Sequence, residues 1–309
     1  MTAVLSMDAA AVRKPVRKIV LARSAGFCFG VRRAVQIAMQ ERKSRPTDSI
    51  TTLGPVVHNE QVSADMRRSG IGCAPTLSEV EQGTVVMSAH GIAPAVRRDA
   101  EQRGLRIVDV TCPFVTKLHR SALELASKNY QIVLVGDPGH TEVKGVIGAL
   151  ADVGATASVI GSVEELAEIP LGKKVGIVSQ TTQYATLFAA VTAAATLRAP
   201  DVRALNTVCG ATEELQDAAI EMAKKVDVAI VVGGKQSANT RRLRELCAAQ
   251  GIPAYHIETA DEIDPRWIDG AEVIGLTAGA STPDAEIEKV ARCLNHGELP
   301  PDWILTHPD

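Results

Sequence analysis

The stretch Arg106-Ile-Val-Asp-Val-Thr-Cys-Pro-Phe-Val-Thr-Lys117 runs from an apolar segment through Cys112 into a sequence with helical character. The same succession surrounds Cys28, after the run Ile19-Val-Leu-Ala22, and Cys209, after the run Val202-Arg-Ala-Leu205. The distance along the chain from one cysteine to the next is about that of one small α/β unit. The pattern therefore predicts a pseudo-threefold chain in which three thiolates meet at one point.

Length and composition describe an ordinary globular protein. The chain has 309 residues, 46% of them hydrophobic and 22% charged, with a net charge of −3. It is long enough for two or three domains, and its charge gives no general attraction to nucleic acid or to an anionic membrane. The basic stretch Val12-Arg-Lys-Pro-Val-Arg-Lys18 lacks the apolar core of a secretory signal, and no apolar run reaches the roughly 18 residues of a membrane span. Residues 1–16 are predicted to be a disordered tail.

Apolar runs of strand length alternate with helix-period stretches along the chain. The strand-like runs are Thr84–Met87, Gln131–Val135, Val175–Val178, Val228–Val232 and Val273–Leu276, and two helix-period stretches are Leu118–Lys128 and Ala211–Lys224. This order predicts an α/β fold with parallel sheets covered by helices. We place three α/β units at residues 17–111, 112–208 and 209–282, and expect the C-terminal segment 283–309 to pack back on the first unit.

Polar residues follow most of these runs, at the sheet edge where ligands bind in parallel α/β folds. The loops are Ser88-Ala-His-Gly91, Gly136-Asp-Pro-Gly-His-Thr-Glu142, Ser179-Gln-Thr-Thr182, Gly233-Gly-Lys-Gln-Ser-Ala-Asn239 and Thr277-Ala-Gly-Ala-Ser281, and Gly54-Pro-Val-Val-His-Asn59 adds another histidine. Their histidines, hydroxyls, amide and glycine-rich backbone are hydrogen-bond donors that suit a diphosphate. Taken singly, each has a structural alternative: a turn for a His loop, a first-turn helix acid for Glu142, and a helix cap for Thr181.

The cysteines favour metal or redox chemistry over a disulfide scaffold, because six in a chain of this length are few and scattered. Cys73, Cys247 and Cys293 lie outside the repeated setting and are predicted to be small buried hydrophobes. Structural zinc prefers four protein ligands, often with a Cys-x-x-Cys pair, which this sequence lacks. Three separated cysteines instead suggest an iron–sulfur cubane in which one iron has no protein ligand.

The chain resembles the 4-hydroxy-3-methylbut-2-enyl diphosphate reductase family, also called LytB/IspH, from about residue 18 to residue 290. The segments that carry the resemblance are Ala25-Gly-Phe-Cys-Phe-Gly-Val31, Gly54-Pro-Val-Val-His-Asn59, Ser88-Ala-His-Gly91, Asp109-Val-Thr-Cys-Pro113, Gly139-His-Thr-Glu142, Gln180-Thr-Thr182, Asn206-Thr-Val-Cys-Gly-Ala-Thr212 and Thr277-Ala-Gly-Ala-Ser-Thr-Pro-Asp284. It implies a trefoil of three α/β units around a central 4Fe-4S cluster. It also implies reductive dehydroxylation of (E)-4-hydroxy-3-methylbut-2-enyl diphosphate to isopentenyl and dimethylallyl diphosphate, the last step of the non-mevalonate isoprenoid pathway.

The resemblance also implies a role for each matching residue. Cys28, Cys112 and Cys209 would be the cluster ligands, Glu142 the proton donor, and Thr181 a contact to the hydroxyl end of the substrate that helps relay the proton. The residues that would bind the substrate, mostly through its diphosphate, are His58, His90, His140, Thr181, Ser237, Ala238, Asn239 and Ser281. A ferredoxin or flavodoxin is the implied electron donor, and the exposed redox chemistry implies a reducing, cytoplasmic location. The oligomeric state is not predicted.

Two positions depart from the family pattern. Ala238 stands where the family usually has the second Ser of Ser-Ser-Asn, which removes a hydroxyl expected to donate to the diphosphate and predicts weaker binding. Leu215 stands where an Arg usually precedes Gln216, which predicts altered electrostatics beside Cys209. These departures leave two alternatives open. One is a diverged paralogue that acts on another allylic or phosphorylated compound, and the other is a non-catalytic iron–sulfur sensor.

Overall fold

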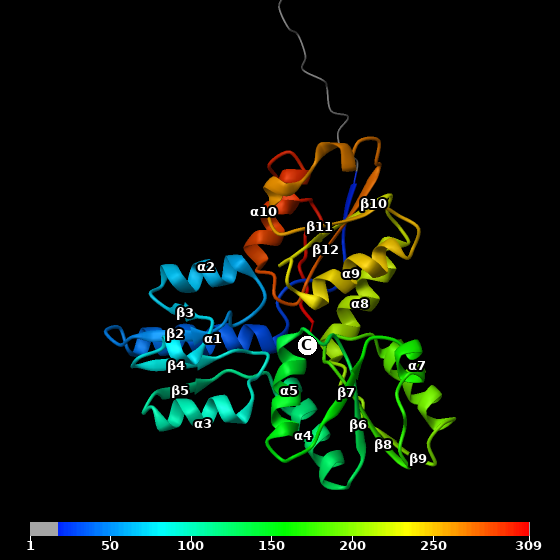
Figure 1. The fold of residues 1–309 in the computed structure, drawn as a ribbon. Coiled ribbons are helices and arrows are strands. Elements are labelled where there is room, and N and C mark those ends of the chain that lie inside the picture. Colours follow the sequence, from blue (N-terminus) through cyan, green and yellow to red (C-terminus); the bar gives the residue numbers. More distant parts are fainter. Residues whose placement is uncertain (1–17, 309) are drawn as a thin grey trace, which may run out of the picture.

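The computed structural model describes residues 18–308, and the predicted tail at 1–16 lies outside them. Three four-stranded sheets lie around a common centre, each with helices on its faces (Figure 1). Every strand pair is parallel. The prediction of an α/β fold in three units is therefore confirmed.

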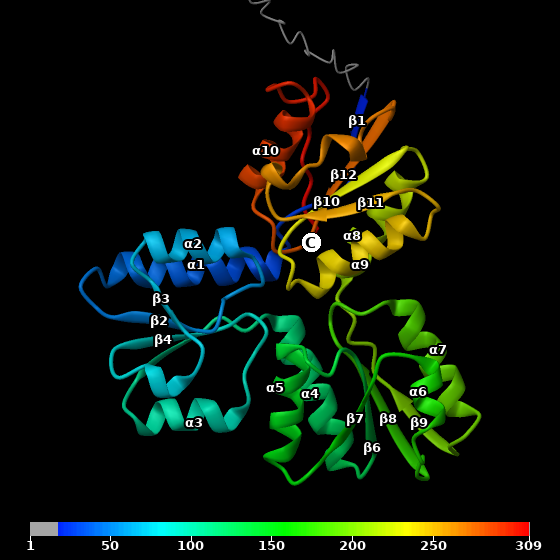
Figure 2. The ribbon, with the colours of Figure 1, turned by 45° about the horizontal axis from the view of Figure 1, so that its top comes forward.

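The first unit is the sheet of order β3-β2-β4-β5 with its helices. Its strands are β2 (Ile50–Leu53), β3 (Gly72–Ala74), β4 (Thr84–Met87) and β5 (Arg106–Asp109). Its helices are α1 (Phe29–Ser44), α2 (Glu60–Arg68) and α3 (Pro94–Gln102), with a short 3₁₀ turn at Leu77–Glu79. Figure 2 shows α1 and α2 on one side of this sheet and α3 on the other.

The second unit repeats this arrangement as the sheet β7-β6-β8-β9. Its strands are β6 (Gln131–Val135), β7 (Ala157–Ile160), β8 (Lys174–Ser179) and β9 (Asp201–Ala204). Its helices are α4 (Pro113–Ser127), α5 (Thr141–Ala151), α6 (Val163–Ala167) and α7 (Ala185–Thr196). The near-continuous apolar sequence of β6 and β8 follows from this covering, because both faces of the sheet are buried.

The third unit has the same strand order, β11-β10-β12-β1, but takes its strands from both ends of the chain. The strands are β1 (Lys18–Leu21), β10 (Val228–Val232), β11 (Ala254–Ile257) and β12 (Val273–Ala278). The helices are α8 (Gly210–Ala223), α9 (Ala238–Ala248) and α10 (Asp284–Leu294), with 3₁₀ turns at Ala260–Glu262 and Pro265–Trp267.

Strand β1 and the C-terminal segment correct the predicted unit boundaries. Strand β1 was assigned to the first unit, but it pairs with β12, with Lys18 opposite Val273. Segment 283–309 was expected to pack on the first unit, but Ile287 and Val290 of α10 share a core with β10 and β12. The segment does lie beside the loop that leads to Cys28, where the Ala25 N–H donates to the Thr306 carbonyl at 2.9 Å. An apolar run looks the same whichever parallel sheet it joins, so the sequence did not reveal this partner.

The chain passes from one unit to the next at each cysteine of the repeated setting. Each edge strand, β1, β5 or β9, is followed by its cysteine and then by a helix that packs in the next unit. The remaining cysteines only partly match their prediction. Cys247 is fully buried in the core of the third unit, whereas Cys73 and Cys293 are exposed. No helix within residues 18–308 combines the length and the apolar character that crossing a bilayer requires.

Candidate active site

Each sheet presents the ends of two central strands and one edge strand to a shared cavity. The first central strand of each sheet along the chain is β2, β6 or β10, and these strands lead to His58, His140 and Ser237 respectively. The second central strand is β4, β8 or β12, and these lead to His90, Thr181 and Ser281. The edge strands β5, β9 and β1 lead to Cys112, Cys209 and Cys28. All nine line one cavity, and Glu142 and Asn239 line it as well. The empty space among these residues, including open solvent at the mouth of the cavity, is about 700 Å³.

The three cysteines occupy the same local structure, at the residue that precedes the first turn of α1, α4 and α8. Burial raises the pKa of each thiol, that of Cys209 to about 11. Backbone N–H groups two and three residues further on act in the opposite direction: those of Gly30 and Val31, for example, lower the pKa of Cys28. Helix N-termini favour anions, so each of the three thiols lies where its thiolate form is stabilised. A bound metal cation would stabilise the thiolates further.

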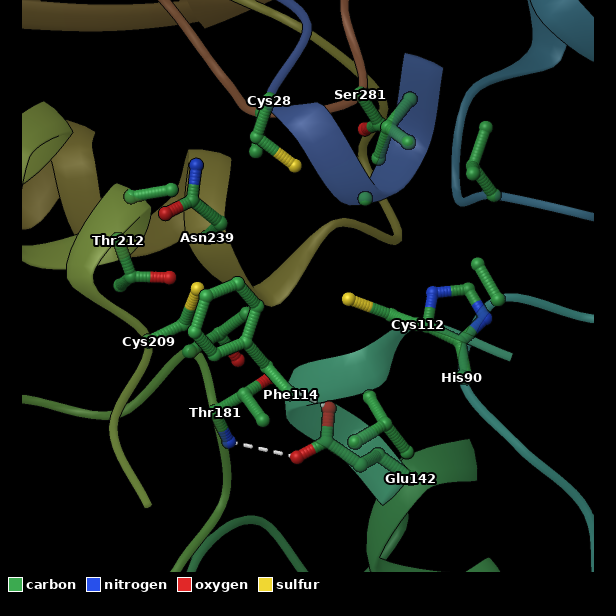
Figure 3. A pocket seen from close by; sticks show the side chains of 18 of the residues that line it. Cys28, His90, Cys112, Phe114, Glu142, Thr181, Cys209, Thr212, Asn239 and Ser281 are labelled. Atoms are coloured by element: carbon green, nitrogen blue, oxygen red, sulfur yellow. Dashed lines mark hydrogen bonds between the residues drawn. The ribbon is translucent and has the colours of Figure 1, made fainter. Parts of the chain in front are cut away.

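The three sulfur atoms point into the same space (Figure 3). A Cβ atom on Gly30 would lie 2.5 Å from Cys112 Sγ and 4.0 Å from Cys28 Sγ, so a larger residue there would have to displace the Cys112 thiol. Within the part of the chain that the structure describes, no group of three or more His, Cys, Asp or Glu side chains is compact enough to hold one metal ion. The soft donor set and its spread around a common volume fit a larger thiophilic group, such as an iron–sulfur cluster.

Glu142 and Thr181 form a closed hydrogen-bonded pair at the edge of this space (Figure 3). The Thr181 N–H donates to Glu142 Oε1 at 2.6 Å, and the Thr181 hydroxyl donates to Oε2 at 2.7 Å. Burial raises the pKa of Glu142 to about 7, although the bonds from Thr181 and the charge of Arg242 act to lower it. A carboxyl group that titrates near neutral pH can hold and release a proton at working pH.

Three half-buried histidines gather in the cavity wall, and one of them, His140, lies two residues before Glu142. The His58 and His90 rings stack at 4.0 Å between centroids, and the His140 ring lies 5.4 Å and 5.8 Å from them. Burial lowers the pKa of all three, that of His140 to about 4, and His58 lowers the pKa of His90 and His140 further. The histidines are therefore neutral near pH 7, and each keeps one ring N–H as a donor.

The backbone fixes which nitrogen of His140 is the donor. His140 precedes the first turn of α5, and its Nδ1 accepts the Glu142 N–H at 3.2 Å. A neutral imidazole that accepts at Nδ1 carries its proton on Nε2. His140 can therefore donate from Nε2 while it caps the helix on which Glu142 lies.

Asn239 of α9 is buried in the cavity wall, where its side-chain amide has no hydrogen-bond partner within residues 18–308. Its side chain is 3% exposed, and neither Oδ1 nor Nδ2 has a partner among the described residues. Ser237 next to it caps α9 by accepting the Thr240 N–H at 3.2 Å, and the Ser281 hydroxyl donates to the His58 carbonyl at 3.2 Å. A buried amide without partners costs free energy unless a ligand satisfies it.

Ala238 and Leu215 lie away from the cavity surface. Ala238 is buried at the start of α9 and is absent from the cavity lining, unlike the other predicted substrate-binding residues. Leu215 is fully buried in the apolar core of the third unit. Sequence reasoning did not select the cavity residues Phe114, Thr182 and Thr212 for a role. Their positions in the sequence could have indicated a role, because Phe114 and Thr212 follow Cys112 and Cys209 by two and three residues and Thr182 follows Thr181 directly.

Comparisons with known proteins agree on one family. The model of the family described as LytB protein matches residues 19–295. The 4-hydroxy-3-methylbut-2-enyl diphosphate reductase of Pelobacter propionicus is 42% identical over 274 residues, which are 88% of this chain and 96% of the relative. The enzyme of the same description from Aquifex aeolicus is 39% identical over 272 residues, covering 88% and 94% of the two chains.

Solved structures extend the likeness to the fold. A structure of (E)-4-hydroxy-3-methyl-but-2-enyl diphosphate reductase, described as the terminal enzyme of the non-mevalonate pathway, is 38% identical and matches with a TM-score of 0.66 over 90% of this chain and 99% of that chain. The E-1-hydroxy-2-methyl-but-2-enyl-4-diphosphate reductase from Plasmodium falciparum is 28% identical, with a TM-score of 0.84 over 94% and 96% of the two chains.

Proposed function

The chain belongs to the LytB protein family, and from that premise we propose that this oxidoreductase converts (E)-4-hydroxy-3-methylbut-2-enyl diphosphate to isopentenyl and dimethylallyl diphosphate. The observation that carries the proposal is the meeting of three cysteines and the Glu142–Thr181 pair in one cavity. Reductive dehydroxylation needs electrons at the carbon that carries the hydroxyl and a proton at the departing oxygen.

Cys28, Cys112 and Cys209 would hold a 4Fe-4S cluster through their thiolates. When bound, the cluster supplies single electrons and a Lewis-acidic iron. The N–H groups at three helix N-termini lower the pKa of these thiols and would stabilise the thiolates. The electrons come from a ferredoxin or flavodoxin donor, as the resemblance implies, and a reducing compartment such as the cytoplasm suits such thiolates.

The diphosphate end of the substrate lies among neutral donors in this proposal. The donors are the ring N–H groups of His58, His90 and His140, the hydroxyls of Ser237 and Ser281, and the Asn239 amide. The N-termini of α5 and α9 add their positive ends to the same region. Neutral donors hold an anion without fixing it as tightly as lysine or arginine would, which suits a product that must leave with the same diphosphate.

Glu142 is the acid that protonates the departing oxygen. Hydroxide is a poor leaving group, so the C–O bond breaks as the Glu142 proton moves to that oxygen and water leaves. Two electrons and a second proton, taken up at either end of the allylic unit, complete the two products. Thr181 orients the carboxyl through two hydrogen bonds, and its hydroxyl lies beside the proton path. The walls of the cavity would limit the access of bulk water to the reduced carbon.

The cavity lining supports this reaction over a diverged paralogue or a sensor. The Ala238 side chain does not line the cavity, whereas all the other predicted substrate-binding residues do. The buried acid and the donor residues, which a sensor would not need, are all on the cavity wall. The deciding experiment is an anaerobic assay of the cluster-reconstituted protein with 4-hydroxy-3-methylbut-2-enyl diphosphate and a reduced viologen dye. Both five-carbon diphosphates are the expected products, and no turnover from a protein with a full cluster would overturn the proposal.

A further inference from the structure

A buried arginine lies where the second and third units meet, behind the cavity wall. The Arg242 side chain of α9 is 4% exposed. Its Nη2 donates to Asp137 Oδ1 at 2.9 Å, and its Nε donates to Gln183 Oε1 at 3.0 Å. Its guanidinium also lies 5.6 Å from the centre of the Tyr184 ring. One side chain of the third unit is thus enclosed by groups of the second unit.

The partners of Arg242 lie on the two loops that carry the Glu142–Thr181 pair. Asp137 is in the loop that runs from β6 to His140, and Gln183 follows Thr181 in the loop from β8 to α7. The two loops also contact each other, because the Asp137 N–H donates to Gln180 Oε1 at 2.9 Å. On its own helix, Arg242 lies one turn beyond Asn239, whose side chain is in the cavity wall.

Arg241 offers a natural comparison with Arg242. It contacts the other oxygen of the same carboxylate, with Nη2 2.9 Å from Asp137 Oδ2, but its side chain is 46% exposed. An exposed ion pair of this kind contributes little, because water and salt screen it. The buried Arg242 loses its hydration, and its Nη1 is buried with no partner among the described residues. Stability alone does not favour such an arrangement over apolar packing.

We propose that Arg242 is a positioning residue, whose guanidinium fixes the β6–α5 and β8–α7 loops of the second unit against helix α9 of the third. The planar fork of arginine can bond two acceptors in different loops at once, which a lysine cannot do with the same geometry. Held in this way, Glu142 and Thr181 keep their place opposite Asn239. A displacement of about 1 Å at such a site lowers the rate on the order of 100-fold.

The test compares Arg242→Met with Arg241→Met as the matched control. Hydrogen exchange of the whole chain is followed by mass spectrometry in peptides that cover residues 136–142 and 180–184. Arg242→Met is expected to exchange at least tenfold faster there than wild type, while Arg241→Met stays within about twofold. Arg242→Lys should be intermediate. If the buried variant does not fold, Asp137→Asn and Arg242→Lys answer the same question by the same readouts.

The second readout is the kcat and KM of the cluster-loaded enzyme, and this readout rests on the proposed function. In the cluster-loaded enzyme, Arg242→Met is expected to lower kcat/KM by about 10- to 100-fold with a raised KM. A smaller folded fraction alone would lower the apparent kcat and leave KM unchanged. Equal exchange and equal KM in Arg242→Met and Arg241→Met would overturn the positioning role. Failure of the wild-type enzyme to turn over would overturn the proposed function instead, and the exchange comparison would still decide the role of Arg242.

Discussion

Glu142 of the second unit and Asn239 of the third are almost equally buried, at 1% and 3% exposure, but they differ in the hydrogen bonds that their polar atoms make. Both carboxyl oxygens of Glu142 accept hydrogen bonds from Thr181, whereas neither end of the Asn239 amide has a partner in the described chain. The cavity wall that Glu142 and Thr181 form is therefore complete in the free protein, in the sense that its buried polar atoms have hydrogen-bond partners. The other is complete only when a ligand supplies the missing hydrogen bonds, at a cost of about 1–3 kcal/mol for each unpaired group until then.

The largest expected effect comes from removing the acid of the complete wall. Glu142→Gln keeps an oxygen that can accept the Thr181 N–H but has no proton to give to the departing oxygen. We expect kcat to fall by about 10²- to 10⁴-fold with little change in KM. Dye-coupled turnover under anaerobic conditions measures this, with iron content and cluster absorbance as controls. Unchanged turnover with an intact cluster would remove Glu142 from the acid role.

The same variant should show how much the burial of Glu142 costs as pH rises. Burial raises its folded-state pKa to about 7 from 4.5, so the native state binds more protons than the unfolded state between these values. The contribution of Glu142 to stability is then fully present below the unfolded pKa and is lost as pH rises to about 7. Relative to wild type, Glu142→Gln should gain about 3 kcal/mol between about pH 4 and about pH 8.

Urea unfolding of the cluster-free proteins at the two pH values measures that difference. The buried histidines act with the opposite sign, because their lowered pKa values remove stability as pH falls. They are present in both proteins, so they largely cancel in the comparison. A difference that stays constant with pH would mean that Glu142 ionises in the cavity as it does in water.

For the incomplete wall, we expect a substitution that weakens function and strengthens the fold. Asn239→Leu removes two buried polar atoms that have no partner in the described part of the chain, so the free energy of unfolding should rise by about 1–3 kcal/mol. The substrate loses hydrogen bonds to a charged group, so KM should rise by about 10- to 100-fold. Such an exchange of stability for binding is typical of buried polar residues whose hydrogen-bond partner is a ligand.

Asn59 is the matched control for that variant. It is also a buried asparagine, but its Oδ1 accepts the Val62 N–H at 3.1 Å and caps α2. Asn59→Leu should therefore destabilise the protein by about 1 kcal/mol and leave the cavity groups in place. If Asn239→Leu destabilises the protein as Asn59→Leu does, Asn239 is a structural residue and the contrast between the two walls is wrong.

The sequence predicted the parts of this site that repeat. Three cysteines in one local setting and polar loops after apolar strands placed Cys28, Cys112, Cys209 and Glu142 around one centre, as the structure has them. Strands β2, β3, β7 and β11 were not recognised. They are short and mix polar or small residues with apolar ones, as in Ile50-Thr-Thr-Leu53, so they lack a clear strand signal.

Features that depend on distant partners could not be predicted. The sheet that β1 joins is fixed only when the chain closes on itself, through pairing with β12. Asp137 and Arg242 are 105 residues apart and each resembles an ordinary surface charge in the sequence. The unpaired state of Asn239 is likewise a property of the assembled wall, because asparagine at the start of a helix more often bonds to the backbone.

The smallest expected effect tests how far the incomplete wall extends beyond Asn239. Ala238→Ser restores the hydroxyl that the sequence lacks, but residue 238 is 2% exposed and does not reach the cavity surface. Because residue 238 does not line the cavity, an added hydroxyl there should contribute no more than about 1 kcal/mol, so KM should change by less than about fivefold. Thermal unfolding controls for overpacking of the added oxygen. A fall in KM of more than tenfold at equal stability would show that a hydroxyl at 238 reaches the diphosphate, and the wall completed by ligand would then include the first turn of α9 as well as Asn239.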